Sequence, residues 1–325
     1  MGYFALTALL LQPATQPPLS PSLVQSSNLQ GVGERGENPK ARGDNNLLGA
    51  GGSVTFVGSD HFAPTIFDDR GGIIIVQGVL NGKQCSVLVD TGAARTMVSP
   101  SFAQLAGLVR YREGPAISTG TARVRSSLAR NFELSVPFQA TFKGEALIAA
   151  TTGVSAALGH QVDVILGRDY LASVSLFIQN SRHRVFISQP GSINAKANGH
   201  TLPLSSSGSI NAEVDGVALR LTVDLGYNGQ IRVKSGKVPV RNGSEKGGGE
   251  RFEVRGEGAL RRVAGLTQAR LDIGDLSPVN VAVVHDNAVP SASDGLIGTG
   301  LLKGYDIIID YMAGSVTLVT AQTAR

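Results

Sequence analysis

The chain has 325 residues, of which 42% are hydrophobic, 5% are aromatic and 41 are glycine. This length fits two domains of about 100 to 150 residues each, and the composition is typical of a soluble globular protein with many short strands and turns. The formal net charge is +4, but the sequence contains no run of five or more Lys and Arg residues. The absence of such a basic run argues against a nucleic-acid partner. We therefore expect a mostly β protein with a sizeable core.

The first 52 residues differ in composition from the rest of the chain. An apolar stretch from Tyr3 to Leu11 is much shorter than the roughly 20 residues of a membrane-spanning helix, so we expect no stable membrane span. Residues 12–52 are rich in Pro, Gly, Ser and Asn. We interpret residues 1–52 as a remnant of an export signal followed by a disordered linker, which implies a periplasmic or secreted protein. A plain disordered segment at the start of a cytoplasmic protein is the alternative.

The strand-rich part of the chain begins near residue 71. Residues 71–92 read GGIIIVQGVLNGKQCSVLVDTG, which predicts two strands joined by an Asn81-Gly82 hairpin turn. The second strand carries a lone cysteine, which we expect to be a small buried side chain, and it ends at Asp90. Residues 99–108 predict a short helix, because a serine stands at the N-cap and a proline at the first helical position.

Three further strand pairs follow. The first is a hairpin around Gly120, and the second covers residues 132–150. An apolar run, Ile165-Leu166-Gly167, then leads into a short helical turn and a last hairpin that ends near residue 187.

The second half of the chain repeats this order. Residues 221–227 read LTVDLGY where residues 87–93 read VLVDTGA, and residues 296–302 read LIGTGLL where residues 165–171 read ILGRDYL. Several anchor points that recur in the same order predict an internal duplication.

The break between the two copies is predicted between Pro190 and Pro203, where the apolar pattern stops. The two copies then define a first lobe over residues 53–190 and a second over residues 203–325.

The repeated aspartate suggests a specific chemistry. Hydrolysis of a peptide bond needs a base that activates water and an acid that protonates the substrate. Two carboxylates about 3 Å apart can do both, because they share one proton. Asp90 and Asp224 are the candidates, and Gly92 and Gly226 let the chain reverse tightly after them. The Thr91 hydroxyl is placed to bond across to the other half.

These motifs resemble the retropepsin-like and pepsin-like aspartic peptidases, especially bacterial proteins with two retropepsin-like lobes in one chain. The resemblance covers about residues 71–320 and implies two β-barrel lobes with short helices. It also implies catalytic roles for Asp90 and Asp224 and a peptide or protein substrate. None of the five histidines stands at a metal-ligand spacing, so we expect no metal and no cofactor. By position, the hairpin around Gly120 corresponds to the family's substrate-covering flap, with Val254–Arg262 as its counterpart.

Two residues depart from the family pattern. Leu225 stands where a threonine or serine is expected, and Ala94 stands where many relatives have a serine. The leading hypothesis is therefore an aspartic endopeptidase with a site between Asp90 and Asp224. Two alternatives stay open: an enzyme active only as a homodimer, with an Asp90 from each chain, and a non-catalytic peptide-binding protein.

Overall fold

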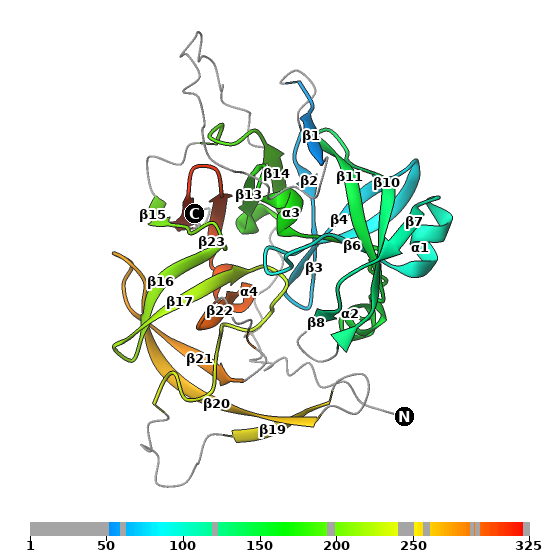
Figure 1. Cartoon of the computed structure of the whole chain (residues 1–325). Helices are drawn as coiled ribbons and strands as arrows, with labels where there is room; N and C mark the ends of the chain where they lie inside the picture. Colours follow the sequence, from blue (N-terminus) through cyan, green and yellow to red (C-terminus); the bar gives the residue numbers. More distant parts are fainter. Residues whose placement is uncertain are drawn as a thin grey trace, which may run out of the picture.

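The computed structural model describes residues 52–58, 63–118, 123–193, 199–239, 250–255, 261–286, 289 and 293–320. These residues form many β-strands and a few short helices, so the prediction of a mostly β protein is confirmed (Figure 1). The predicted export signal and nearly all of the predicted linker lie outside the described residues, as does Gly120. None of the helices within the described part is long and apolar enough to cross a membrane.

The first half of the chain forms a closed barrel of six strands. Hydrogen-bonded neighbours follow the order β4-β5-β12-β6-β11-β10, and β10 returns to pair with β4. The strands are β4 (Ile73–Leu80), β5 (Lys83–Val89), β6 (Met97–Val98), β10 (Ser126–Val136), β11 (Ala140–Ala149) and β12 (Val164–Leu166). The predicted hairpin is β4 and β5, and its turn residues Asn81 and Gly82 both have positive φ, of 49° and 78°.

A second closed ring of six strands lies in the second half of the chain. Its order is β16-β17-β22-β18-β21-β20, and β20 closes back onto β16. The strands are β16 (Ser209–Val214), β17 (Val217–Asp224), β18 (Ile231–Val233), β20 (Arg261–Asp272), β21 (Val279–His285) and β22 (Gly295–Gly298). Each strand has a counterpart in the first barrel, and the parallel pairs β5–β12 and β6–β11 correspond to β17–β22 and β18–β21.

A six-stranded sheet joins the two barrels (Figure 1). Its order is β2-β14-β13-β23-β24-β15, with three strands from each half of the chain. The strands are β2 (Thr65–Ile66), β13 (Ser175–Gln179), β14 (Arg184–Ser188), β15 (Gly199–Pro203), β23 (Tyr305–Asp310) and β24 (Ser315–Thr320). At its centre β13 and β23 run antiparallel, from Ser175 opposite Asp310 to Ile178 opposite Ile307. The two halves are therefore fastened together by backbone hydrogen bonds.

Shorter strands extend these three sheets or pair beside them. They are β1 (Ser53–Phe56), β3 (Asp68–Arg70), β7 (Val109–Glu113), β8 (Ile117–Ser118), β9 (Arg123–Val124) and β19 (Glu250–Arg255). β8 and β9 pair with each other as the predicted hairpin around Gly120, with Ile117 opposite Val124.

The helices are short and connect strands, with α3 and α4 each leading from a barrel strand to a strand of the joining sheet. Helix α1 (Pro100–Leu105) confirms the predicted helix and its cap, because the Ser99 hydroxyl accepts a hydrogen bond from the Phe102 amide at 3.3 Å. Helix α2 (Thr152–Leu158) was not predicted. Helices α3 (Arg168–Leu171) and α4 (Thr299–Leu302) each follow the glycine that ends an apolar strand, at corresponding places in the two halves.

The inward faces of both barrels and of the joining sheet form a continuous apolar core. Cys85 lies in this core, and desolvation raises the pKa of its thiol to about 12. A thiol with so high a pKa stays protonated and inert. The expectation that this cysteine is a small buried side chain is confirmed.

Candidate active site

The first half of the site is the loop that follows β5. The Asp90 amide donates to the Leu166 carbonyl at 3.0 Å, which fixes the end of β5 against β12. The Asp90 carboxylate Oδ1 then accepts two backbone hydrogen bonds, from the amides of Gly92 at 2.8 Å and Ala93 at 2.9 Å. Both donors favour the ionised form of this carboxyl group.

The second half of the site is the corresponding loop after β17. Asp224 ends the strand opposite Gly298 of the parallel strand β22. Its carboxylate Oδ1 accepts a hydrogen bond from the Gly226 amide at 2.9 Å. The Asp224 carboxylate is therefore held by one described backbone donor, where Asp90 has two.

The fold brings the two loops face to face. A methyl group added at Gly226 would stand 2.5 to 2.6 Å from the carboxyl atoms of Asp90, and one added at Gly92 would overlap the carboxyl group of Asp224. Each carboxyl group therefore packs on the bare backbone of the opposite glycine, and the two carboxyl groups are hydrogen-bonded to each other. Both aspartates keep some exposed surface, so water can reach the pair.

The environment raises the pKa of both carboxyl groups. For Asp90 the main cause is desolvation, opposed by the Ala93 and Gly92 amides and by the positive charge of Arg168. For Asp224 the causes are desolvation and then the negative charge of Asp90. Two close carboxylates cannot both ionise readily, so the pair holds one proton to a higher pH than an isolated aspartate would. Such a pair can accept a proton at one oxygen while donating one from another.

Thr91 links the two halves directly beneath the pair. Its hydroxyl donates to the Val223 carbonyl at 2.7 Å and accepts from the Leu225 amide at 3.0 Å, and the residue is fully buried. Leu225, at the corresponding place in the second half, is also fully buried but has no hydroxyl to return the bonds. The side-chain hydrogen bonds at this pair of positions therefore come from Thr91 alone, and the Leu225 side chain returns none.

We expect Thr91→Val to destabilise the protein by about 2 to 4 kcal/mol. Valine has nearly the same shape as threonine, but it leaves the Val223 carbonyl and the Leu225 amide buried without a partner, at about 1 to 3 kcal/mol for each group. Urea denaturation followed by circular dichroism measures the loss. Thr91→Ser, which keeps the hydroxyl, should recover most of it, and equal losses in the two variants would contradict the role of this hydrogen bond.

Sequence reasoning missed a buried support behind the Asp90 loop. The Asp169 carboxylate accepts from both the amide and the hydroxyl of Thr96, at 2.8 and 2.7 Å, and the same hydroxyl accepts from the Gly167 amide at 3.0 Å. These bonds tie the Asp90 loop to the start of α3. The signal in the sequence that could have indicated these bonds is Asp169, which stands two residues after the Ile165-Leu166-Gly167 run.

Two predicted flap segments cannot be placed fully. Gly120 and its neighbours 119–122 lie outside the described residues, so the flap assignment stays a prediction. The same holds for residues 256–260, at the centre of the predicted counterpart Val254–Arg262.

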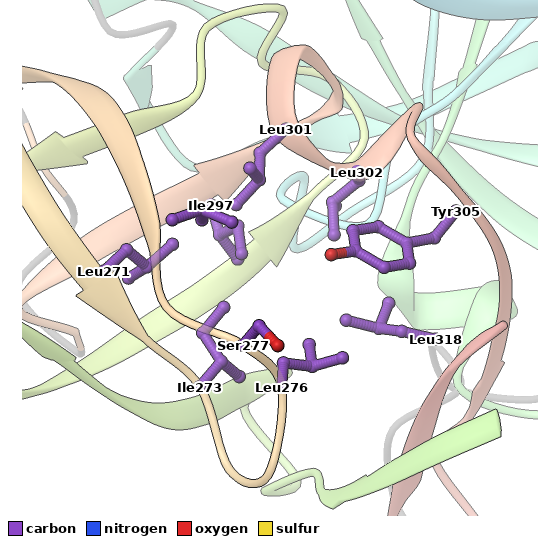
Figure 2. Close-up of a pocket in the computed structure, with 10 residues that line it drawn as sticks. Leu271, Ile273, Leu276, Ser277, Ile297, Leu301, Leu302, Tyr305 and Leu318 are labelled. Atoms are coloured by element: carbon purple, nitrogen blue, oxygen red, sulfur yellow. The ribbon is translucent and has the colours of Figure 1, made fainter. Parts of the chain in front are cut away.

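An apolar pocket lies in the second half, away from the aspartate pair (Figure 2). It is enclosed by side chains of the second barrel, α4 and the joining sheet, and the Tyr305 hydroxyl points into it. Neither Asp90 nor Asp224 lines it. The lining residues are Leu271, Ile273, Leu276, Ser277, Val279, Ile297, Leu301, Leu302, Tyr305 and Leu318.

A comparison with known protein families finds a match over the first barrel. The family described as aspartyl protease matches residues 76–170, which run from β4 into α3 and include the Asp90 loop. This segment is therefore similar to aspartyl proteases, a similarity that suggests a hydrolase. A search of curated proteins found no match to the chain.

Proposed function

We propose that the protein is an aspartic endopeptidase whose site is formed within one chain by Asp90 and Asp224. In this proposal the second barrel is a second retropepsin-like lobe that arose by internal duplication. The observation that carries the proposal is the reciprocal packing of each carboxyl group on the glycine of the opposite loop. The matching strand order of the two rings and the family match over the first barrel also support it.

The unequal hydrogen bonding of the two carboxyl groups suggests which one acts as the base and which one acts as the acid. Asp90, with two amide donors and a nearby guanidinium, is the better anion and acts as the base. Asp224, with one donor and a negative neighbour, keeps the shared proton and acts as the acid. The pair therefore enters the reaction with a single proton, on the Asp224 side.

The reaction then needs no covalent enzyme intermediate. Asp90 takes a proton from water as the water oxygen attacks the peptide carbonyl carbon, and Asp224 gives its proton to the carbonyl oxygen. The tetrahedral product breaks its C–N bond as the leaving nitrogen receives the proton from Asp90. A hydroxyl proton of the same intermediate returns to Asp224, which restores the singly protonated pair.

The joining sheet favours the single-chain site over the homodimer alternative. Three strands from each half already complete this sheet, and Asp90 already faces a carboxyl group of its own chain. The alternative of a non-catalytic peptide-binding protein is motivated by Leu225, which has no hydroxyl to match the hydrogen bonds of Thr91.

Cleavage in isotopic water tests the proposal. The full chain is incubated with an unfolded protein substrate in H₂¹⁸O between pH 3 and 8, and the products are sequenced by mass spectrometry. We expect internal cleavage with one ¹⁸O atom in each new carboxylate and no product trapped by added hydroxylamine. Binding of the substrate without cleavage at any pH would favour the non-catalytic alternative and refute the enzyme.

A further inference from the structure

Arg168 is the first residue of α3 and lies directly behind the Asp90 loop. Its amide donates to the Ala93 carbonyl at 2.8 Å. Ala93 is one of the two residues whose amides hold the Asp90 carboxylate. The backbone of Arg168 therefore belongs to the framework that sets the position of Asp90.

The side chain of Arg168 crosses to the other half of the molecule. Its Nη1 donates to the Ser207 carbonyl at 2.7 Å, in the turn before β16. The next residue, Gly208, accepts a hydrogen bond at its carbonyl from the Val223 amide at 2.9 Å, one residue before Asp224. One side chain thus connects the Asp90 loop to the backbone that carries Asp224.

Gly208 leaves room for this crossing. A methyl group there would stand 3.4 Å from Nη1 of Arg168 and 3.0 Å from the hydroxyl of Tyr311. Gly208 also has a φ of +79°, which favours glycine. Arg168 and the partly buried Tyr311 therefore lie side by side at Gly208.

The corresponding position in the second half carries no charge. Thr299 is the first residue of α4, as Arg168 is of α3, and its amide and hydroxyl both donate to the Tyr227 carbonyl, at 2.8 and 3.2 Å. The return crossing is made instead by the neutral Asn228 side chain, whose Nδ2 donates to the Gly71 carbonyl at 2.9 Å. Of these two corresponding helix starts, only the one in the first half therefore carries a positive charge.

We propose that Arg168 is a positioning residue that bridges the two halves and, together with the amides of Gly92 and Ala93, favours Asp90 over Asp224 as the ionised member of the pair. This inference rests on the proposed function for its catalytic consequence, although the ionisation itself can be measured without any substrate. Arg168 would thereby assign the base and acid roles in the reaction, and it would compensate in part for the hydroxyl that Leu225 lacks.

The charges around the pair agree with this assignment. Arg168 lowers the pKa of Asp90. Desolvation raises the pKa of the neighbouring Tyr311, and the positive charge of Arg168 opposes that rise. On the opposite side the charged neighbour of Asp224 is Arg232, which stacks 4.5 Å from the centre of the Tyr227 ring and has its Nε 4.0 Å from the Asp286 carboxylate. The charge of Arg232 is thus shared with Asp286.

Carboxyl ¹³C NMR titration of the full chain tests the proposal. The resonance of Asp90 is assigned from its loss in Asp90→Asn. Arg168→Gln keeps a side-chain donor for the Ser207 carbonyl but removes the positive charge. Arg168→Lys keeps a donor and the positive charge. We expect Arg168→Gln to raise the lower apparent pKa of the pair by about one pH unit, the lower end of the effect of a neighbouring opposite charge. Arg168→Lys should leave this pKa near the wild-type value.

A matched control is Arg270→Gln. Arg270 belongs to β20 of the second barrel, pairs with Asp272 at 3.3 Å, and has a side chain that is 63% exposed. This variant should leave the titration of the pair unchanged. If Arg168→Gln titrates like wild type, or if the Gln and Lys variants shift equally, the inference is wrong.

The acid limb of kcat/KM provides the second readout. With Arg168→Gln this limb should move to higher pH together with the NMR value, and kcat should fall more than KM changes. If wild type cleaves no substrate but the NMR shift appears, the proposed function fails and the role of Arg168 in ionisation stands. If wild type cleaves but Arg168→Gln moves neither the NMR value nor the acid limb, the proposed function stands and the role of Arg168 in ionisation is wrong.

Discussion

Asp90→Asn and Asp224→Asn should each lower kcat/KM for peptide cleavage by about three orders of magnitude or more. The amide of asparagine can neither accept the proton of the attacking water nor donate an acidic proton, and general acid–base catalysis is worth about 10² to 10⁴ in rate for each role. Because the two groups act as one unit, the double variant should lose little more than either single variant. The measurement is initial cleavage rate at the optimal pH, with folding checked by near-UV circular dichroism.

The same variants separate the single-chain site from a homodimeric one. If two copies of Asp90 formed the site, Asp224→Asn would keep its activity and the active species would be a dimer in gel filtration. Asp294→Asn is the matched control, because it makes the same substitution in the second half at a residue whose carboxylate binds the Arg220 amide and Lys237. We expect this control to cleave at the wild-type rate.

Local sequence signals predicted much of the first barrel. Asn81-Gly82 specified a two-residue hairpin because both residues tolerate positive φ. Alternation and apolar runs indicated the strands, and the Ser99-Pro100 pair indicated the start of α1. The repeat then placed Asp224 at the same point of a strand end as Asp90, and the structure brings the two together. Their catalytic role stays a proposal.

Other features were not predictable from local pattern. Helix α2 consists of Thr, Gly, Val, Ser, Ala and Leu residues without a side-chain cap, so neither propensity nor capping marked it. The crossing of Arg168 to Ser207 depends on how two distant parts of the chain pack, and no sequence spacing indicates it. The sequence showed that Leu225 lacks a hydroxyl. Only the structure shows that Thr91 still makes both of its own bonds across the interface.

The shared proton has a consequence for stability that the Asp224→Asn variant isolates. Because the pKa of Asp224 is raised in the folded state, the folded protein binds more protons than the unfolded chain between the ordinary aspartate value of about 3.9 and the raised value. The free energy of unfolding therefore decreases as pH rises through this window. A tenfold difference in proton affinity between the two states corresponds to about 1.4 kcal/mol. Asparagine has no proton to lose, so this penalty is absent in the variant.

We therefore expect Asp224→Asn to be more stable than wild type at pH 7.5 and close to wild type at pH 4, while being inactive at both. Thermal denaturation at the two pH values measures the difference, which should appear at pH 7.5 as a rise in Tm of several degrees. Asp294→Asn should behave in the opposite way, because Lys237 and the Arg220 amide lower the pKa of Asp294. That carboxylate stabilises the fold above its unfolded pKa, and its removal should cost stability at pH 7.5. An Asp224→Asn variant no more stable than wild type at pH 7.5 would show that the pair carries no raised pKa, and the shared proton on which the proposed mechanism depends would have to be abandoned.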